Sequence, residues 1–267
     1  MRISHQVLPA LRILMAALIW NQCFVPHCGA QTEESEAAKV ARAGRLAKKD
    51  RPAGRLRKDE DGHVISMKLC YCTDQEIEAI DFRVFKNLKS LWIMYSGTSR
   101  SIAHLAKMDA ELEFLAILNS PIDDKELPNL LRKQKSLECL WINGTRITDD
   151  SLVEVGKHPN VKVLHLNRNA LTDTGAKHLA KMPELRILNL SDTKLSDAGL
   201  RELKALDRLG GLSVCRTSIT DAGLRDFCDH ARPFPFSINS IAVGGTKVTE
   251  KVRKSLKESF PGIEITD

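Results

Sequence analysis

The chain has 267 residues with a formal net charge of +6, 43% hydrophobic residues and only 5% aromatic residues. Residues 1–60 hold 11 Lys or Arg against 6 Asp or Glu, which leaves 29 against 28 for the rest of the chain. The body of the chain is therefore nearly neutral, which argues against a nucleic-acid partner there. Its length and aliphatic composition fit one domain whose core contains few rings.

The first 30 residues read as a secretory signal peptide. A basic start is followed by an apolar stretch at residues 13–20 (ILMAALIW) and by the small residues Cys28-Gly29-Ala30. We expect cleavage near Ala30, and hence a protein that is secreted or lies in the periplasm or cell envelope. The alternative is an uncleaved membrane anchor, because residues 7–25 are nearly long enough to span a membrane although they include polar residues.

Residues 31–62 are rich in charge, alanine and glycine, and we expect them to form a disordered, solvated linker. Their basic side chains could touch nucleic acid or an anionic surface, but a solvated tether is the favoured interpretation. We therefore expect no nucleic-acid partner, and membrane contact only if the N-terminal segment stays uncleaved. The basic residues considered are Arg42, Arg45, Lys48, Lys49, Arg51, Arg55, Arg57 and Lys58.

A 24-residue period follows the linker. Looser copies precede and follow four in-register units, and a fixed period of this length is the signature of a stacked repeat array. The in-register units are LECLWINGTRITDDSL from Leu137, VKVLHLNRNALTDTGA from Val161, LRILNLSDTKLSDAGL from Leu185 and LGGLSVCRTSITDAGL from Leu209. The looser units begin at Val64, Leu88, Leu112 and Ile238.

Each unit predicts a short strand, a turn and a helix. Counted from the first residue of a unit, positions four and six lie on one face of a strand and must be buried by stacking. The small polar residue at position nine is suited to bond backbone groups in the turn. In Ser196-Asp197-Ala198-Gly199-Leu200 we expect the hydroxyl to cap a helix, Asp197 to meet its dipole, and Leu200 to enter the core.

The pattern L-x-x-L-x-L-x-x-T/N-x-I/L-T/S-D resembles the leucine-rich repeat family, in the T-D-A-G-L variety common in bacterial proteins and similar to F-box and ribonuclease-inhibitor-like repeats. The resemblance covers about residues 64–267. It implies an α/β solenoid, a right-handed horseshoe with parallel strands on the concave face and helices on the convex face. It also implies a function in binding.

We therefore assign residues 63–267 to a repeat domain of about eight units. Residues 261–265 (PGIEI) predict a last strand that caps the open end. The step from Leu209 to Ile238 is 29 residues, and its extra length contains the segment 232–236 (RPFPF), which predicts a loop insertion or a lateral contact.

Motifs of catalysis and cofactor binding are absent. The chain has no G-x-x-x-x-G-K-[ST], G-x-S-x-G or H-E-x-x-H, and Cys70-x-Cys72 lacks the second pair of a zinc site. His158 falls at a structural position equivalent to Met182, whereas His165 is expected to point outward from a strand. We therefore expect no enzyme, no metal site and no cofactor.

The outward strand positions three, five, seven and eight carry the sequence's clearest functional signal. Every Trp and Tyr outside the leader falls on this predicted concave face of the first four units. Large rings on an exposed sheet are unusual unless they are covered, and Trp and Tyr often dominate binding energy. The predicted partner-binding residues are Tyr71, Trp92, Met94, Tyr95, Phe114, Leu118, Trp141 and His165.

Two functions remain open. The favoured one is a non-catalytic, exported module that binds a protein or peptide on its concave face. The other is a structural or assembly protein tethered to the envelope by an uncleaved apolar segment. The rings also have an alternative explanation, in which the linker or a terminal cap covers them, or in which the register slips near Leu88 and Leu112.

Overall fold

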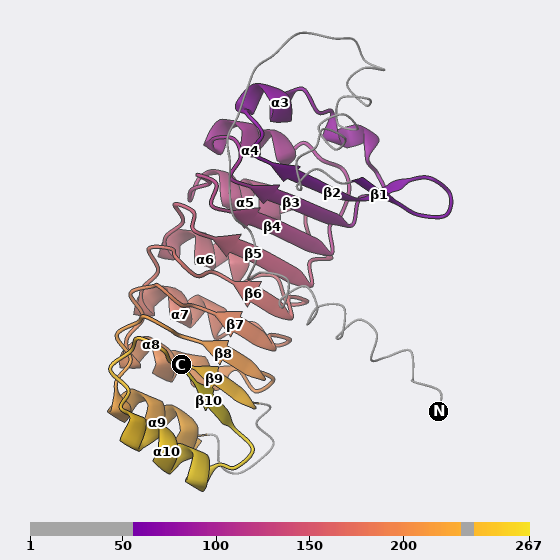
Figure 1. Cartoon of the computed structure of the whole chain (residues 1–267). Helices are drawn as coiled ribbons and strands as arrows, with labels where there is room; N and C mark the ends of the chain where they lie inside the picture. The colour runs from indigo at the N-terminus through magenta and orange to yellow at the C-terminus, as the bar shows by residue number, and fades with distance from the viewer. Residues whose placement is uncertain (1–55, 231–237) are drawn as a thin grey trace, which may run out of the picture. The chain divides into compact units, whose positions relative to one another are not determined.

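A computed structural model describes residues 56–230 and 238–267 (Figure 1). The expected leader, most of the expected linker and the 232–236 insertion lie outside these residues. Within the described part of the chain, no helix has the length and apolar character needed to cross a membrane.

Ten strands of the described residues form one open sheet in chain order. From β2 to β10 every neighbouring pair is parallel, as the sequence predicts. The strands are β1 (Leu56–Lys58), β2 (Val64–Cys70), β3 (Ser90–Met94), β4 (Phe114–Leu118), β5 (Cys139–Asn143), β6 (Val163–His165), β7 (Ile187–Asn189), β8 (Gly211–Ser213), β9 (Ser240–Ala242) and β10 (Glu264–Thr266).

The first strand was not predicted. It lies within the segment expected to be linker, and it pairs antiparallel with β2, with Leu56 opposite Met67. Leu56 packs against the hydrophobic core, and Gly62 adopts a φ of 84° in the hairpin that joins the two strands. The sheet therefore begins before residue 63. The predicted capping strand at the other end is confirmed as β10.

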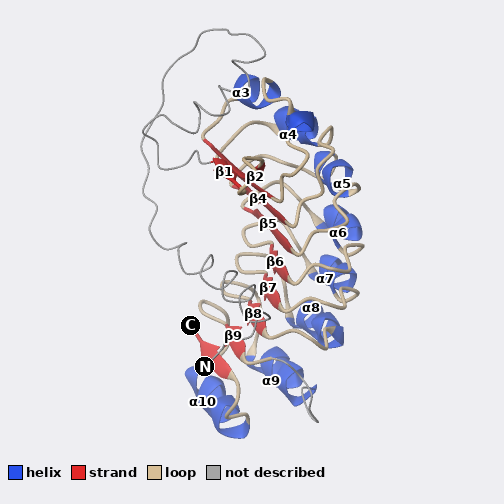
Figure 2. Cartoon of the chain, turned by 90° about the vertical axis from the view of Figure 1, so that its right-hand side faces the viewer, coloured by secondary structure: helices blue, strands red, loops and turns tan. Residues whose placement is uncertain are grey.

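The helices lie together along one side of the strands (Figure 2). Strands and helices alternate along the chain, which is the two-layer α/β arrangement of a solenoid. The α-helices are α3 (Asp74–Glu78), α4 (Ser99–Leu105), α5 (Glu126–Leu131), α6 (Asp149–Val155), α7 (Asp173–Leu179), α8 (Asp197–Glu202), α9 (Asp221–His230) and α10 (Glu250–Ser259), with 3-10 turns η2 (Phe82–Val84) and η3 (Leu203–Ala205).

The core lies between the two layers and follows the predicted positions. Positions four and six of all eight units are no more than 3% exposed, and Leu200 is fully buried. In β3 and β4 the predicted register holds, since Leu91 pairs with Leu115 and Trp92 with Ala116. The possible slip near Leu88 and Leu112 is therefore excluded.

Position nine forms a polar spine, as expected. The backbone N–H of Ser96 donates to Ser120 Oγ (3.1 Å), and the N–H of Thr145 donates to Asn169 Oδ1 (2.9 Å). The Asn169 amide in turn donates to the backbone carbonyl of Ile142 (2.6 Å). These bonds satisfy buried backbone groups where the chain turns from strand to helix.

The aspartates of the T/S-D turns link successive repeats. Ser196 caps its own helix by accepting from the N–H of Ala198 (3.3 Å), as predicted. Asp173, however, accepts from both the N–H (2.7 Å) and the hydroxyl (2.6 Å) of Ser196 in the next repeat. The same two bonds join Asp74 to Thr98, Asp124 to Thr148, Asp149 to Thr172, Asp197 to Thr220, and Asp221 to Thr249.

The glycine of T-D-A-G-L makes room for this aspartate. A Cβ on Gly199 would lie 2.4 Å from Asp173 Oδ1, and one on Gly175 would lie 2.4 Å from Asp149 Oδ1. The motif is therefore explained by contacts between repeats.

We expect Gly199→Ala to lower the free energy of unfolding by about 1 kcal/mol, because the clash with Asp173 outweighs the better helix propensity of alanine. Urea unfolding measures the change. Gly262→Ala is the matched control, since a Cβ there meets nothing within 4 Å. A gain in stability for Gly199→Ala would contradict the proposed reason for the glycine.

Candidate functional site

The outward face of β3 to β6 carries a continuous row of rings, formed by Trp92, Phe114, Trp141 and His165 and called here the aromatic row. Trp92 stacks on Phe114 with ring centroids 4.5 Å apart, and Trp141 stacks on His165 at 4.8 Å. Trp92 and Trp141 approach to 5.3 Å although they lie two strands apart. The small side chain of Ala116, which lies between them in the register, allows this approach.

The row has a cationic neighbour at its N-terminal end. Lys68 places its Nζ atom 5.2 Å from the centroid of the Trp92 ring, which is a cation–π distance. The Trp92 indole N–H donates to Ser90 Oγ (3.2 Å) on the same strand. Strand β3 and its neighbours thus hold this ring in one orientation.

The predicted site residues differ in how far their side chains are exposed to solvent. Tyr71 and Tyr95 are 41% and 46% exposed, whereas Leu118 and Trp141 are only 0% and 2% exposed. The last two lie on the predicted face but are buried, so they do not offer a contact surface of their own. Trp92, Met94, Phe114 and His165 are half-buried.

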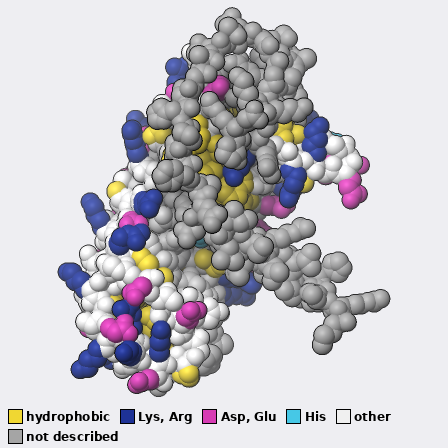
Figure 3. Space-filling view, viewed as in Figure 1, with side chains coloured by type: hydrophobic (Ala, Val, Ile, Leu, Met, Phe, Trp, Pro, Cys, Tyr) yellow, Lys and Arg dark blue, Asp and Glu magenta, His cyan; other side chains and the backbone are white. Residues whose placement is uncertain are grey.

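This face has apolar residues that do not belong to the solenoid core. Figure 3 shows hydrophobic side chains gathered over the strands of the first repeats, with Lys and Arg beside them. Six buried apolar residues of positions three, five and seven lie outside the core cluster. They are Cys70, Ala116, Leu118, Cys139, Trp141 and Val163.

Tyr71 and Tyr95, called here the tyrosine pair, follow β2 and β3 at position eight. Their rings are nearly parallel, 5° apart, with centroids at 5.2 Å. Both residues adopt a left-handed backbone, with φ of 54° and 49°. The turn requires this conformation, because Asn119, Gly144, Arg168, Asp192, Arg216 and Gly245 share it at the same position of later units. Sequence reasoning missed it because only two of these residues are glycines.

The later repeats make the same face polar. Asp192 accepts from Arg216 Nη2 (2.6 Å) and lies 3.7 Å from Arg168 Nε. The hydrogen bond from Arg216 holds the pKa of the Asp192 carboxyl below its ordinary value. Ser191 and Ser213 hydroxyls bond to each other at 2.8 Å. The face therefore changes from aromatic to hydrogen-bonding between β6 and β8.

His165 is a member of the aromatic row by its position, and its ring is also uncharged like the others. Burial lowers the pKa of His165 to about 4, so the ring is neutral at pH 7. A neutral imidazole stacked on Trp141 acts as a flat ring, and it brings no charge to the site.

The other buried histidine, His158, has the structural position that the sequence predicts. It is 1% exposed, and no hydrogen bond of normal geometry reaches its ring nitrogens among the described residues. Burial lowers the pKa of His158, and the charge of Lys135 lowers it further. The equivalent residue of the next repeat is Met182, which is also 1% exposed.

We expect His158→Met to raise the free energy of unfolding by about 1 kcal/mol at pH 7, because it removes a buried polar ring. The unfolded chain binds a proton near pH 6.5, whereas the folded chain binds it only at a lower pH, so the wild type loses stability as the pH falls below 6.5. Urea unfolding at pH 7 and pH 5 should show a smaller loss for the variant. Equal losses would contradict this role of His158.

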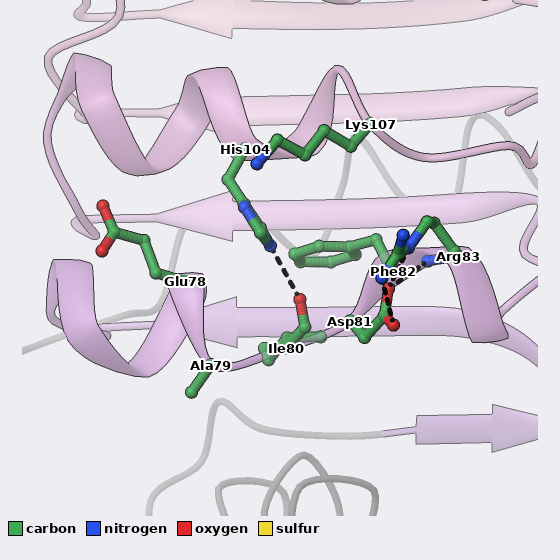
Figure 4. A pocket seen from close by; sticks show the side chains of 8 residues that line it. All are labelled: Glu78, Ala79, Ile80, Asp81, Phe82, Arg83, His104 and Lys107. Atoms are coloured by element: carbon green, nitrogen blue, oxygen red, sulfur yellow. Dashed lines mark hydrogen bonds and ion pairs between the residues drawn. The ribbon is translucent and has the colours of Figure 1, made fainter. Parts of the chain in front are cut away.

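A small cavity of about 260 Å³ lies on the helical side, between α3 and α4. Figure 4 shows two polar contacts in its lining: His104 Nε2 lies 3.0 Å from the carbonyl of Ile80, and Arg83 pairs with Asp81. Arg83 holds the pKa of Asp81 at about 2. The described lining residues contain no nucleophile beside a base, so they do not form a catalytic constellation.

The potential metal ligands are one carboxylate and histidine cluster in a turn and the cysteines. Asp59, Asp61 and His63, in the β1–β2 turn, offer ligand atoms within 4.8 Å of one another and could hold a cation. Asp59 already accepts from the N–H of His63 (2.8 Å). The five cysteines of the described residues form no disulfide, and burial raises the pKa of Cys72, Cys139 and Cys228 to about 12. Those three thiols are poor ligands and nucleophiles at pH 7.

These features define a repeat solenoid with a row of aromatic rings on one face of its sheet. The family model described as "Leucine Rich repeat" matches residues 157–180 and 181–204. Together with the repeated strand and helix, this match shows that the chain is a leucine-rich repeat protein. Repeats of this family support a general role as a protein-binding module, and the family is typically non-catalytic.

Two further comparisons add little. A crystal structure of a plant ice-binding protein is similar at 15% sequence identity and a TM-score of 0.45, over 74% of this chain and 64% of that one. The chain therefore spans less than two thirds of that structure, and the likeness carries no functional argument. No curated protein matches the sequence.

Proposed function

We propose that this leucine-rich repeat protein is an exported, non-catalytic module that binds a protein or peptide partner through the concave face of its first repeats. One observation carries the proposal: the aromatic row lies on the outward face of β3 to β6, and the tyrosine pair directly follows β2 and β3. This surface is separate from the core that holds the repeats together.

The accessible members of the site are suited to bind a partner. Trp and Tyr give large contact area at a low entropy cost, and such residues often dominate binding energy. Trp92 and Phe114 are partly exposed, and Tyr71 and Tyr95 more so. A partner that covers them removes apolar surface from water.

The experiment compares partner capture by matched variants. Trp92→Ala with Phe114→Ala is expected to weaken binding about tenfold, since each truncation removes apolar contact area without opening the core. Val153→Ala, which truncates a 45% exposed residue on helix α6, is the control. Crosslinking of the mature protein in its native setting identifies the partner, and purified variants then give the dissociation constants. Equal binding by both variants would place the site elsewhere.

The tethered alternative is motivated by the apolar stretch at residues 13–20. In that function the repeats serve assembly at the envelope and the N-terminal segment remains in the membrane. N-terminal sequencing of the native protein separates the two proposals. A first residue near Gln31 supports export with cleavage, and a first residue at Met1 supports the tether.

A further inference from the structure

The chain contains only two tyrosines, and the structure stacks them on each other. Tyr71 and Tyr95 occupy the same position of adjacent repeats, 24 residues apart, directly after two strands whose residues Cys70 and Met94 pair in register. Backbone bonds fix both turns, since the N–H of Tyr71 donates to the carbonyl of Met94 (3.0 Å) and that of Tyr95 to the carbonyl of Leu118 (2.9 Å).

The backbone itself does not favour tyrosine here. A left-handed conformation costs an ordinary L-residue stability, and bulky side chains are unusual in it, whereas glycine, asparagine and aspartate tolerate it. Later units have Asn119, Gly144, Asp192 and Gly245 at this position, and also Arg168 and Arg216. Because every unit has this conformation at position eight, the turn fixes where each phenol lies.

The phenols are also the most exposed oxidisable side chains of the first two repeats, since Trp92 and Met94 are half-buried. Tyr71 and Tyr95 are 41% and 46% exposed, whereas the nearby thiols of Cys70 and Cys72 are 8% and 7% exposed. An oxidant in solution therefore reaches the tyrosines more readily than the thiols. A radical formed on one ring would have the other ring stacked on it, with centroids at 5.2 Å.

We propose that Tyr71 and Tyr95 form an oxidative coupling site that yields an intramolecular dityrosine between the first two repeats. Each phenol gives up one electron and one proton, and the two phenoxyl radicals join through a carbon–carbon bond between carbons ortho to the hydroxyls. The two ortho hydrogens then move to the oxygens and restore the phenols. The oxidant is hydrogen peroxide acting through a haem peroxidase, which takes up the two electrons and two protons and leaves two waters.

The bond would link β2 and β3 near the N-terminal end of the sheet. Among the described strands, the short β1 is the one that lies beyond β2 at that end. The five described cysteines make no disulfide. The dityrosine bond would therefore connect two repeats that no disulfide between described residues connects. A cross-link that closes a loop restricts the unfolded chain and so favours the folded one. The inference does not depend on a partner at the aromatic row.

The test treats the purified full chain with horseradish peroxidase and hydrogen peroxide. We expect dityrosine fluorescence, an intact monomer that has lost the mass of two hydrogen atoms, and a rate that does not change with protein concentration. Tyr71→Phe and Tyr95→Phe should each abolish the product. After trypsin, the peptides that contain Tyr71 and Tyr95 should be found joined, since Lys86 and Lys89 separate them in sequence.

The matched control moves one ring while the tyrosine count stays at two. In Tyr95→Asn with Asn119→Tyr, the rings lie two strands apart, about 9.6 Å, and at least a tenfold slower coupling is expected. Wild-type protein unfolded in urea provides the same comparison without a substitution. Covalent dimers in place of the coupled monomer, an unchanged mass, or an equal rate in urea would each overturn the proposal.

Discussion

Asp173→Ala combined with Asp197→Ala is expected to lower the free energy of unfolding by about 4 kcal/mol, or about 2 kcal/mol for each interface between repeats. Asp173 accepts two hydrogen bonds from Ser196, and Asp197 accepts two from Thr220. Each truncation leaves a backbone N–H and a hydroxyl of the next repeat without that acceptor. Because each carboxylate serves a different interface, the two losses should nearly add.

Two controls separate this role from a simple helix-dipole effect. Asp150→Ala removes an exposed carboxylate from the first turn of α6, and it should cost at most about 1 kcal/mol. The double Asp→Asn variant keeps one acceptor oxygen at each site and should lose about half as much as the double alanine variant. Urea unfolding gives these values. If Asp150→Ala were as costly as Asp173→Ala, the bonds between repeats would not be the reason.

The repeat architecture could be predicted because each unit buries its own periodic residues. Leu188 and Leu190 lie two positions apart in the sequence and enter one core, as strand periodicity requires. The bonds of the aspartates could not be predicted from one unit, because the acceptor Asp173 and the donor Ser196 are 23 residues apart. The glycine of the motif was the available signal, since a helix rarely gains from glycine.

The sequence predicted which side chains share the outward face of the strands, but it did not predict how exposed each of them is. Strand alternation placed Trp92, Trp141 and His165 on one face, and the register confirms it. Whether a ring is exposed depends on its neighbours on other strands, and Ala116 determines how closely Trp92 approaches Trp141. Strand β1 was missed because three residues within a charged segment show no alternation.

Trp141→Ala is expected to lower the free energy of unfolding by about 3 kcal/mol, at the lower end of what a buried Trp truncation costs. The ring is 2% exposed and contacts the rings of Trp92, Phe114 and His165. Removing it takes away the central member of the aromatic row. For this reason Trp141 is unsuitable for testing the partner site, where lost binding would be confused with lost stability.

The pKa of His165 gives a second, independent readout of the same change. Burial lowers that pKa to about 4, and Trp141 stacks on the imidazole at 4.8 Å. Trp141→Ala should therefore raise the pKa of His165 toward its ordinary value, whereas Trp141→Phe should preserve most of the shift and most of the stability. NMR titration of the imidazole measures it. If neither the pKa nor the stability changed in Trp141→Ala, the ring would be accessible to solvent, and Trp141 would join Trp92 and Phe114 as a contact residue.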